Sequence, residues 1–268
     1  MTKYSISTLI LISFLLSSCE KPEVIELKPG HYLEAVYDEI EITKSVIYGN
    51  QPQTHWMDLY QAQNDSLPSR PLVILAPGGG FNPELIHDSY EWLKPLAEKL
   101  AHAGYLVALI NYTTGETDSP EKYKRVFYSA LYDLKAVIRF FRRDADHENF
   151  YRTDVDRIFT GGWSAGAQIG LFNAYANNPG ELSSSQLHEL MAYEGFDGNR
   201  GSPGYSSQVT GMIALAGNMA ELNRMQNGDP VILCVHSTED YTVRIDSQAS
   251  AFGMAFGSRP IIDRAHDV

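Results

Sequence analysis

Short apolar runs alternate with longer amphipathic stretches along the chain from about residue 42 onward. Continuous apolar runs such as 72–76 and 105–110 are typical of strands that are covered on both faces of a sheet. Between 124 and 143, apolar residues recur at spacings of three and four, which predicts a helix with one apolar face and its charges elsewhere. This alternation predicts an α/β fold, in which a mostly parallel twisted sheet carries helices on both faces.

The other predicted elements follow the same rhythm. The strand-like runs 42–48 and 56–60 are separated by a turn, which predicts an early hairpin. Helices are expected at 90–103, where Gly104 provides the terminating residue, and at 244–256. Further strands are expected at 157–160, 209–215 and 231–235.

A polar stretch rich in glycine and serine, 181–208, interrupts this rhythm. Irregular segments of this length are more often functional or disordered than neutral connectors. The sequence therefore leaves two interpretations open, an insertion over the active face or a plain surface loop.

Composition narrows the class of protein. A chain of 268 residues with 44% apolar residues can bury one large core, and we expect one domain. The formal net charge of -12 and the absence of a basic stripe argue against a nucleic-acid partner, because phosphate binding relies on clustered lysine and arginine. The dispersed acidic residues are typical of a solvated surface.

The N-terminus has the features of an export signal. Lys3 precedes an apolar run, 6–16, which is shorter than the roughly 20 residues that span a bilayer. The run ends at Leu16-Ser17-Ser18-Cys19, which resembles a bacterial lipobox. This resemblance implies cleavage before a lipid-modified Cys19; an ordinary signal peptide is the alternative.

These features predict a division of the chain into a lipoprotein signal peptide (1–18), a tether (19–40) and an α/β-hydrolase domain (41–268). The protein is expected to be exported and anchored to a bacterial membrane, on the periplasmic or cell-surface side. Membrane contact is expected only through the lipid at the N-terminus.

The pentapeptide Gly162-Trp163-Ser164-Ala165-Gly166 lies between a short apolar strand and a stretch of small residues that begins a helix. In this strand-turn-helix setting, a tight turn lifts the serine hydroxyl clear of the sheet. Glycines on both sides are needed because a Cβ atom at either position would meet neighbouring backbone. Ser164 is therefore predicted to be a nucleophile, and a purely structural serine is the alternative.

A second glycine cluster, Ala76-Pro77-Gly78-Gly79-Gly80-Phe81, follows the first buried strand. It resembles the His-Gly-Gly-Gly oxyanion motif of lipases and esterases, with Pro77 at the usual histidine position. The resemblance implies that the backbone amides of Gly79, Gly80 and Ala165 stabilise a developing oxyanion. A flexible glycine turn is the alternative. The chain has neither G-x-G-x-x-G, a Walker motif nor His-Glu-x-x-His, so no cofactor and no metal are expected.

The acidic partner of Ser164 should follow it in the chain, at the end of a later strand. The segment from His236 to Val243 resembles the His-Gly-x-x-Asp-x-x-Val segment of these hydrolases, which implies that Asp240 orients the catalytic imidazole. Glu239, one residue away, is the rival carboxylate. His236 is expected to support the loop, because it precedes the acid in the chain.

The sequence leaves two interpretations of the general base open. In the chain order serine, acid, histidine, His266 is the one candidate after Asp240, and it requires Ile261-Ile262 to form a very short strand. Alternatively, the region after Gly257 precedes the last strand, so that strand and the histidine lie beyond Val268. The chain is then C-terminally incomplete, and we expect it to bind substrate with little turnover, because losing the base costs about a million-fold.

Residues 42–268 resemble the bacterial esterase and lipase branch of the α/β-hydrolase superfamily, close to acetyl-xylan and feruloyl esterases. This resemblance implies a carboxylic-ester hydrolase that forms an acyl-enzyme, with acylated carbohydrate or a small ester as substrate. A serine peptidase or thioesterase would differ in its pocket and share the catalytic residues. A catalytically silent lipoprotein that binds glycan or a partner is the alternative from another class.

Overall fold

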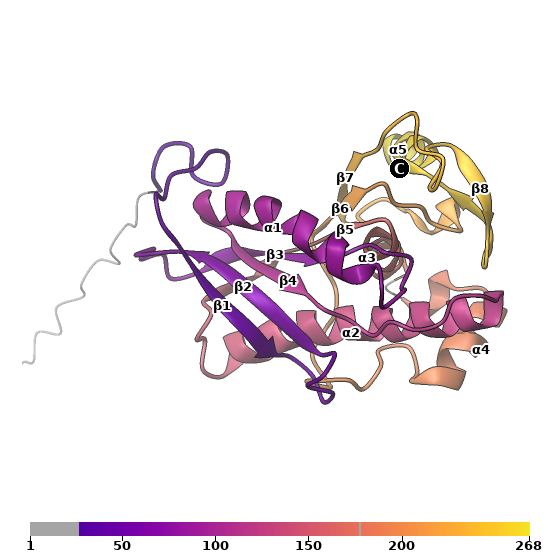
Figure 1. The fold of residues 1–268 in the computed structure, drawn as a ribbon, viewed down its shortest axis with the longest axis horizontal. Coiled ribbons are helices and arrows are strands. Elements are labelled where there is room, and N and C mark those ends of the chain that lie inside the picture. Colours follow the sequence, from indigo (N-terminus) through magenta and orange to yellow (C-terminus); the bar gives the residue numbers. More distant parts are fainter. Residues whose placement is uncertain (1–26, 177) are drawn as a thin grey trace, which may run out of the picture.

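The computed structural model describes residues 27–176 and 178–268. A sheet of seven strands in the order β1-β2-β4-β3-β5-β6-β7 forms its centre (Figure 1). Strand β2 pairs antiparallel with both β1 and β4, and the remaining neighbours are parallel. The strands are β1 (Ile40–Ile47), β2 (Trp56–Ala62), β3 (Arg70–Ala76), β4 (Leu106–Ile110), β5 (Thr153–Trp163), β6 (Gly211–Leu215) and β7 (Val231–Val235).

Helices cover both faces of this sheet, as the alternation of elements predicted. Helix α1 packs on the face that carries Val73 and Leu75, and α2 and α3 pack on the face that carries Leu72 and Ile74. Successive side chains of β3 thus alternate between two cores, because side chains point to opposite faces of a strand. The helices are α1 (Ile86–His102), α2 (Pro120–Asp146), α3 (Ala165–Tyr175), α4 (Ser184–Tyr193) and α5 (Ser258–Asp267).

The predictions of the early hairpin, the buried strands and the helix across 124–143 are confirmed. The predicted helix at 244–256 is wrong, because this segment contains a hairpin of β8 (Ser247–Ser250) and β9 (Gly253–Phe256). A turn replaces the helix there: Gly253 has a φ of 98°, and the Ser250 hydroxyl bonds both the Phe252 amide and the Gly253 carbonyl. Ile261 and Ile262 lie in α5, so the short strand considered for them is also wrong.

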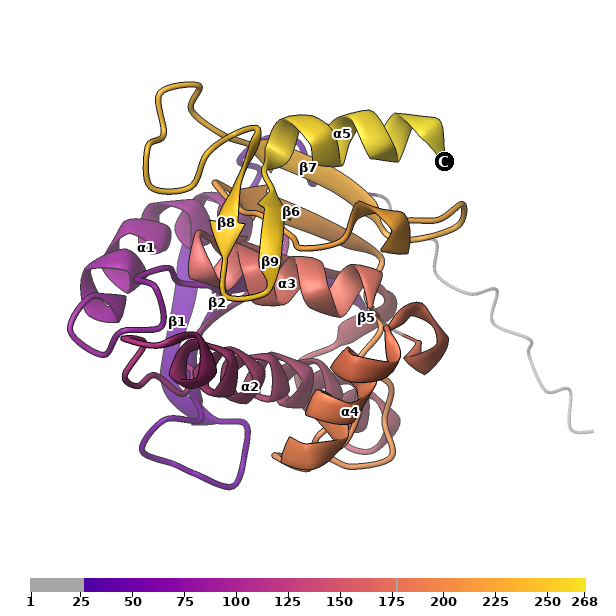
Figure 2. The ribbon, with the colours of Figure 1, turned by 90° about the vertical axis from the view of Figure 1, so that its right-hand side faces the viewer.

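The segment 181–208 folds into more than a loop. It contains α4 and lies beside α2 (Figure 2), where the Tyr128 hydroxyl donates to Glu189 over 3.0 Å. Ser183 and Gln186 form a capping box that begins α4. Short 3-10 helices precede α4 (Pro179–Glu181) and follow β6 (Leu222–Arg224).

The sequence predicted that the charged residues of α2 lie away from its apolar, buried face. Three of them are buried in the structure. Asp133 Oδ1 accepts a hydrogen bond from Arg200 over 3.0 Å and lies 2.9 Å from His55 Nε2. Lys135 donates to the Phe196 carbonyl over 2.7 Å, and Arg139 donates to backbone carbonyls of the same segment. These bonds fasten the chain after α4 onto α2, because each buried charge needs a partner to offset its desolvation.

Part of the predicted tether, from residue 27 onward, lies within the described residues. Cys19 and the signal segment 1–18 lie outside the described residues. From Tyr32 to Tyr37 the chain packs on the end of α1, where Tyr32, Val36 and Tyr37 donate amide hydrogen bonds to Ala103 and His102. Within residues 27–176 and 178–268, no helix has the length and apolar character needed to cross a membrane.

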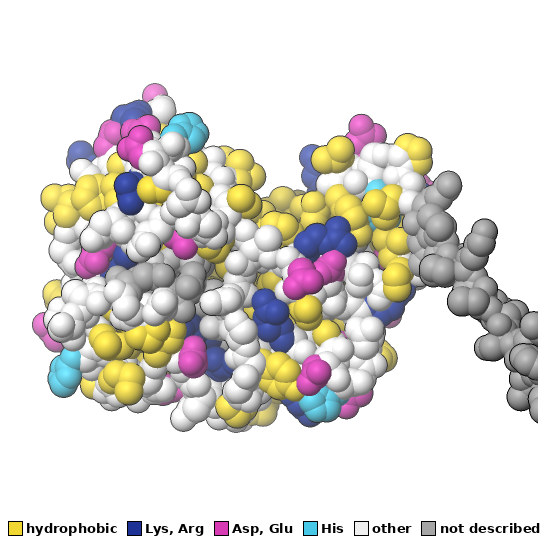
Figure 3. All heavy atoms as spheres, turned by 180° about the vertical axis from the view of Figure 1, so that it is seen from behind, with side chains coloured by type: hydrophobic (Ala, Val, Ile, Leu, Met, Phe, Trp, Pro, Cys, Tyr) yellow, Lys and Arg dark blue, Asp and Glu magenta, His cyan; other side chains and the backbone are white. Residues whose placement is uncertain are grey.

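Strand β7 forms one edge of the sheet in the described structure, and its side chains divide by face. Ile232 and Cys234 pack toward α3 and α5, whereas Val231, Leu233 and Val235 are exposed on the other face. Seen from behind, the molecule is hollowed between the part with α1 and the part with β7 (Figure 3). A shallow apolar groove there is lined by Val73, Leu100, Tyr105, Phe159, Gly211, Met212, Ile213, Val231, Ile232 and Leu233.

The buried Lys135 gives a testable dependence of stability on pH. Burial lowers the pKa of Lys135 to about 8. Between this value and the unfolded value of about 10.4, the unfolded chain binds more protons, so stability rises with pH. From pH 7.5 to 9.5, we expect the free energy of unfolding of the wild type, relative to Lys135→Met, to rise by about 2 kcal/mol.

Urea denaturation at a series of pH values measures this difference. Lys44→Met, at an exposed position on β1, provides the matched control for removing a lysine. An equal change with pH in the Lys135→Met and Lys44→Met comparisons would contradict the prediction.

Candidate active site

Ser164 lies in a strained turn between β5 and α3. Its φ of 51° and ψ of -113° are unusual for a residue with a side chain. The Ser164 amide donates to the Leu215 carbonyl over 2.8 Å, and the Gln168 amide donates to the Ser164 carbonyl over 3.0 Å. These two bonds fix the serine against β6 and the first turn of α3.

The flanking glycines are needed for space. A Cβ atom on Gly162 would overlap the backbone of Gly166, and one on Gly166 would overlap the carbonyl groups of Ala76 and Pro77. Real Cβ atoms do not approach backbone this closely, so the turn requires glycine at both positions. The predicted reason for the glycines in the pentapeptide is therefore confirmed.

The glycine cluster after β3 forms a tight loop beside this turn. Gly79 and Gly80 have φ angles of 97° and 61°, and Phe81, with a φ of 62°, continues the left-handed backbone. Ser89, buried on α1, accepts the Gly78 amide over 2.6 Å, and the Tyr112 hydroxyl donates to the Pro77 carbonyl over 2.7 Å. The loop is thus anchored from beneath.

The amides of Gly79 and Gly80 are available to a ligand. Within residues 27–176 and 178–268, neither amide donates a hydrogen bond. Both residues line the cavity that Ser164 also lines. Ala165, the third predicted donor, begins α3 directly after Ser164; it is buried and is not among the residues that line the cavity.

Asp240 lies in the loop after β7. Its Oδ1 accepts the amides of Thr242 and Val243, each over 2.9 Å, so backbone bonds fix the carboxylate. Glu239 is exposed and does not line the cavity that Asp240 lines. The geometry favours Asp240 over its neighbour.

His236 has the supporting role expected from the sequence. Its Nε2 donates to the Val243 carbonyl over 2.7 Å and lies 3.6 Å from Asp240 Oδ2. Its Nδ1 lies 2.8 Å from Ser258 Oγ, which joins the loop to the start of α5. Because both ring nitrogens have partners in the loop and α5, His236 holds the loop that carries Asp240.

One cavity of about 460 Å³ brings these residues together. It opens at the carboxyl ends of β3, β5, β6 and β7, where ligands bind in open parallel sheets. The lining comprises Gly78, Gly79, Gly80, Leu85, Asp88, Ser89, Trp92, Trp163, Ser164, Ala216, Asp240, Thr242 and Val243.

The described structure brings no histidine to this cavity. His266 is exposed on α5 and lines another cavity, together with Gly228 and Val231 at the opposite end of β7. The interpretation of His266 as the base of Ser164 is therefore wrong.

The profile of the BD-FAE family matches residues 57–200, which is more than half of the chain. The chain belongs to the BD-FAE family, whose domain is an esterase-like α/β-hydrolase. Among curated proteins, none matches its sequence.

Solved structures show the same fold for this BD-FAE domain. The bifunctional GH43-CE from Bacteroides eggerthii has a TM-score of 0.59 at 17% identity, over 84% of this chain and 30% of its own. The chain therefore spans less than a third of that protein. A truncated carbohydrate esterase from gut microbiota has a TM-score of 0.57 at 19% identity, over 79% and 81% of the two chains.

A third similar structure is esterase 2 of Thermogutta terrifontis phosphorylated by paraoxon. It has a TM-score of 0.50 at 18% identity, over 76% of this chain and 73% of its own. At these identities, the three likenesses establish the fold. The predicted α/β-hydrolase fold is confirmed.

The structure also brings to the cavity residues that the sequence did not reveal. Ser89 anchors the glycine loop, and Trp92 and Ala216 line the cavity from α1 and the end of β6. Ala216 has a φ of 50°, which is a strained angle. The Ala216 amide donates a hydrogen bond to the Val235 carbonyl, which helps to hold this angle. Non-glycine residues with positive φ carry no signal in a single sequence.

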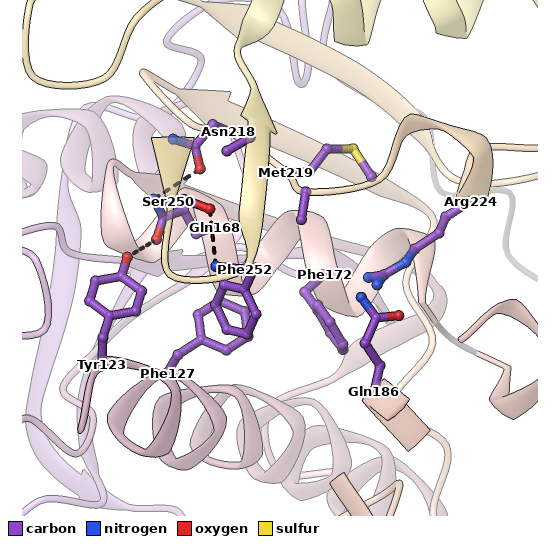
Figure 4. A pocket seen from close by; sticks show the side chains of 12 residues that line it. Tyr123, Phe127, Gln168, Phe172, Gln186, Asn218, Met219, Arg224, Ser250 and Phe252 are labelled. Atoms are coloured by element: carbon purple, nitrogen blue, oxygen red, sulfur yellow. Dashed lines mark hydrogen bonds between the residues drawn. The ribbon is translucent and has the colours of Figure 1, made fainter. Parts of the chain in front are cut away.

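A second, smaller cavity of about 40 Å³ lies between α2, α3 and the β8–β9 hairpin (Figure 4). Phe127, Phe172 and Phe252 give it an aromatic wall. Gln168, one turn beyond Ser164, accepts the Tyr123 hydroxyl over 2.5 Å and donates to Asn218 over 3.0 Å. Burial raises the pKa of Tyr123 to about 12, so its hydroxyl stays protonated as the donor. These hydrogen bonds fix the first turns of α3, and Tyr123 also packs against Phe81 of the glycine cluster, with ring centroids 5.5 Å apart.

Among the described residues, no group of three or more histidine, cysteine and acidic side chains is arranged to hold a metal ion.

The close approach at Gly166 predicts a large effect of one methyl group. Gly166→Ala should destabilise the domain by about 3 kcal/mol or more, because the new Cβ meets fixed backbone of β3 and the residue after it. Gly228→Ala is the matched control, since Gly228 has a φ of 92° and open space around its Cβ position. We expect the control to cost only about 1–2 kcal/mol of backbone strain.

Urea denaturation of both variants tests the prediction. Equal losses of stability in the two variants would show that the close backbone contact at Gly166 does not restrict the size of this residue.

Proposed function

We propose that this protein is a carboxylic-ester hydrolase that uses Ser164 as its nucleophile and forms an acyl-enzyme. The observation that carries the proposal is one cavity lined by Ser164, Asp240 and the two glycines of the loop. Within the part of the chain that the structure describes, the amides of Gly79 and Gly80 donate no hydrogen bond. Strained backbone at a nucleophile and free amides beside it are the arrangement that acyl transfer requires.

In the proposed reaction, Ser164 Oγ attacks the ester carbonyl carbon and its proton passes to a base. The carbonyl oxygen becomes an oxyanion, which accepts hydrogen bonds from Gly79, Gly80 and Ala165. Collapse breaks the bond to the alcohol, which takes the proton from the base. Water then repeats the attack on the acyl-enzyme and releases the acid.

Asp240 has the role of orienting the base. Backbone amides bind one of its oxygens and leave the other 3.6 Å from the His236 ring. The described residues place no histidine between Asp240 and Ser164. A small diffusible imidazole can supply this proton transfer, so the proposal is testable on the 268-residue chain.

The proposed substrates are acylated carbohydrates or small esters. Membership of the BD-FAE family and the likeness to structures titled as a carbohydrate esterase and a GH43-CE protein support this class. We further propose, from the Leu16-Ser17-Ser18-Cys19 sequence, that the protein is exported and held on a bacterial membrane through a lipid on Cys19.

The decisive experiment measures hydrolysis of 4-nitrophenyl acetate with and without added imidazole, together with the intact mass of the protein. We expect transient acetylation of Ser164 and imidazole-dependent turnover above the rate of imidazole alone. Ser164→Ala should lose both, because the acyl-enzyme cannot form without the hydroxyl.

Ser185→Ala, at an exposed position on α4, is the control for removing a hydroxyl elsewhere and should behave as the wild type. Absence of acetylation and of protein-dependent turnover would overturn the esterase proposal and favour a silent binding protein.

A further inference from the structure

Two tryptophans lie side by side at the cavity that contains Ser164. Trp163 directly precedes the serine, and Trp92 reaches the cavity from α1. Their ring centroids are 4.8 Å apart with an interplanar angle of 40°. The two residues are 71 positions apart in the sequence, so the fold brings their rings together.

Trp92 is exposed to an unusual degree for an indole in a folded domain. Its side chain is 63% exposed, whereas α1 buries Ser89, Tyr90 and Leu93 beside it. Leaving so large an apolar ring in water is unfavourable, at about 25 cal/mol for each Å² of apolar surface. An exposed indole at a ligand cavity is therefore explained most directly by a ligand that covers it.

The surroundings of Trp92 specify the kind of ligand. Asp88, one helical turn earlier, and Thr242, from the loop of Asp240, line the same cavity and are both exposed. A flat ring therefore lies among hydrogen-bonding groups. A pyranose ring matches this arrangement, because its axial C–H bonds form an apolar face and its hydroxyls lie around the edge; the electron-rich face of the indole attracts those C–H bonds.

The openness of the site decides which part of the substrate lies there. Trp163 covers one side of Trp92, and much of the Trp92 side chain faces solvent. The alcohol of an acylated carbohydrate continues beyond the ester into further sugar units. An open surface accommodates that continuation.

We propose that Trp92, backed by Trp163, is the platform on which the sugar ring of the substrate stacks while Asp88 accepts a hydrogen bond from a sugar hydroxyl. This assignment rests on the proposed function and adds to it the residue that positions the alcohol part. Trp92 is a positioning residue, since it holds the sugar and takes no part in the proton transfers at Ser164.

Binding of an unreactive sugar tests the platform without requiring turnover. In a Ser164→Ala background, calorimetric titration with xylotetraose and with cellotetraose should detect binding. Adding Trp92→Ala should weaken it by about tenfold or more, corresponding to loss of one stacking contact. Trp92→Tyr should recover most of the affinity, because it restores an aromatic face.

Phe150→Ala is the matched control, because Phe150 is also an exposed aromatic residue and precedes the amino end of β5, the strand whose carboxyl end leads to Ser164. It should leave sugar binding unchanged. Circular dichroism and thermal unfolding of each variant separate a loss of binding from a loss of fold.

The possible failures are distinguishable. Undetectable sugar binding, or equal binding by the Trp92→Ala variant, would overturn the platform even if Ser164 is acetylated by the aryl ester. The same titration with 2-naphthol tests an aromatic ligand. If Trp92→Ala weakens binding of 2-naphthol and leaves binding of both sugars unchanged, the surface binds an aromatic alcohol and the sugar platform is overturned. Sugar binding that depends on Trp92 without acetylation of Ser164 would support the platform and refute the esterase.

Discussion

The contact between the backbone of α3 and the ends of β3 and β5 is the constraint on which the site depends. Gly162 and Gly166 lie so close to each other, and to the carbonyl of Ala76, that neither position has room for a methyl group. This close contact requires the strained backbone angles of Ser164 and brings the first residues of α3 beside the glycine loop. Strain of about 1–3 kcal/mol at such a residue persists only where the surrounding structure fixes it.

The fully buried strands β3 and β4 provide that fixed surrounding. Close-packed interiors resist deformation, so a turn that rests on them keeps its angles. Ser89, on α1, and Tyr112, which follows β4, are both buried and hold the glycine loop. Ser164 and the two glycine amides are therefore held by closely packed, hydrogen-bonded elements, as the proposed stabilisation of a developing charge requires.

Much of this site was predictable from the sequence because its determinants are local. Ser164, Gly79 and Gly80 each belong to a short motif that follows a buried strand, and parallel strands bring their carboxyl ends to one edge. The hairpin at 247–256, the buried charges on α2 and Trp92 were missed because each depends on distant partners. His266 was a candidate base because it follows Asp240 in the chain. Its actual position, at the other end of β7, depends on the direction of α5, which the sequence does not reveal.

The two sides of the cavity differ in how they are held, and this difference suits different tasks. On one side, strands and buried hydrogen bonds hold Ser164 and the glycine loop. On the other, a loop carries Asp240 and Thr242, fixed mainly by its own amides and by His236. In the proposed reaction, the side built from strands holds the groups that stabilise charge, and the loop side fixes the carboxylate that orients the base. An exposed indole, that of Trp92, lies at the same cavity.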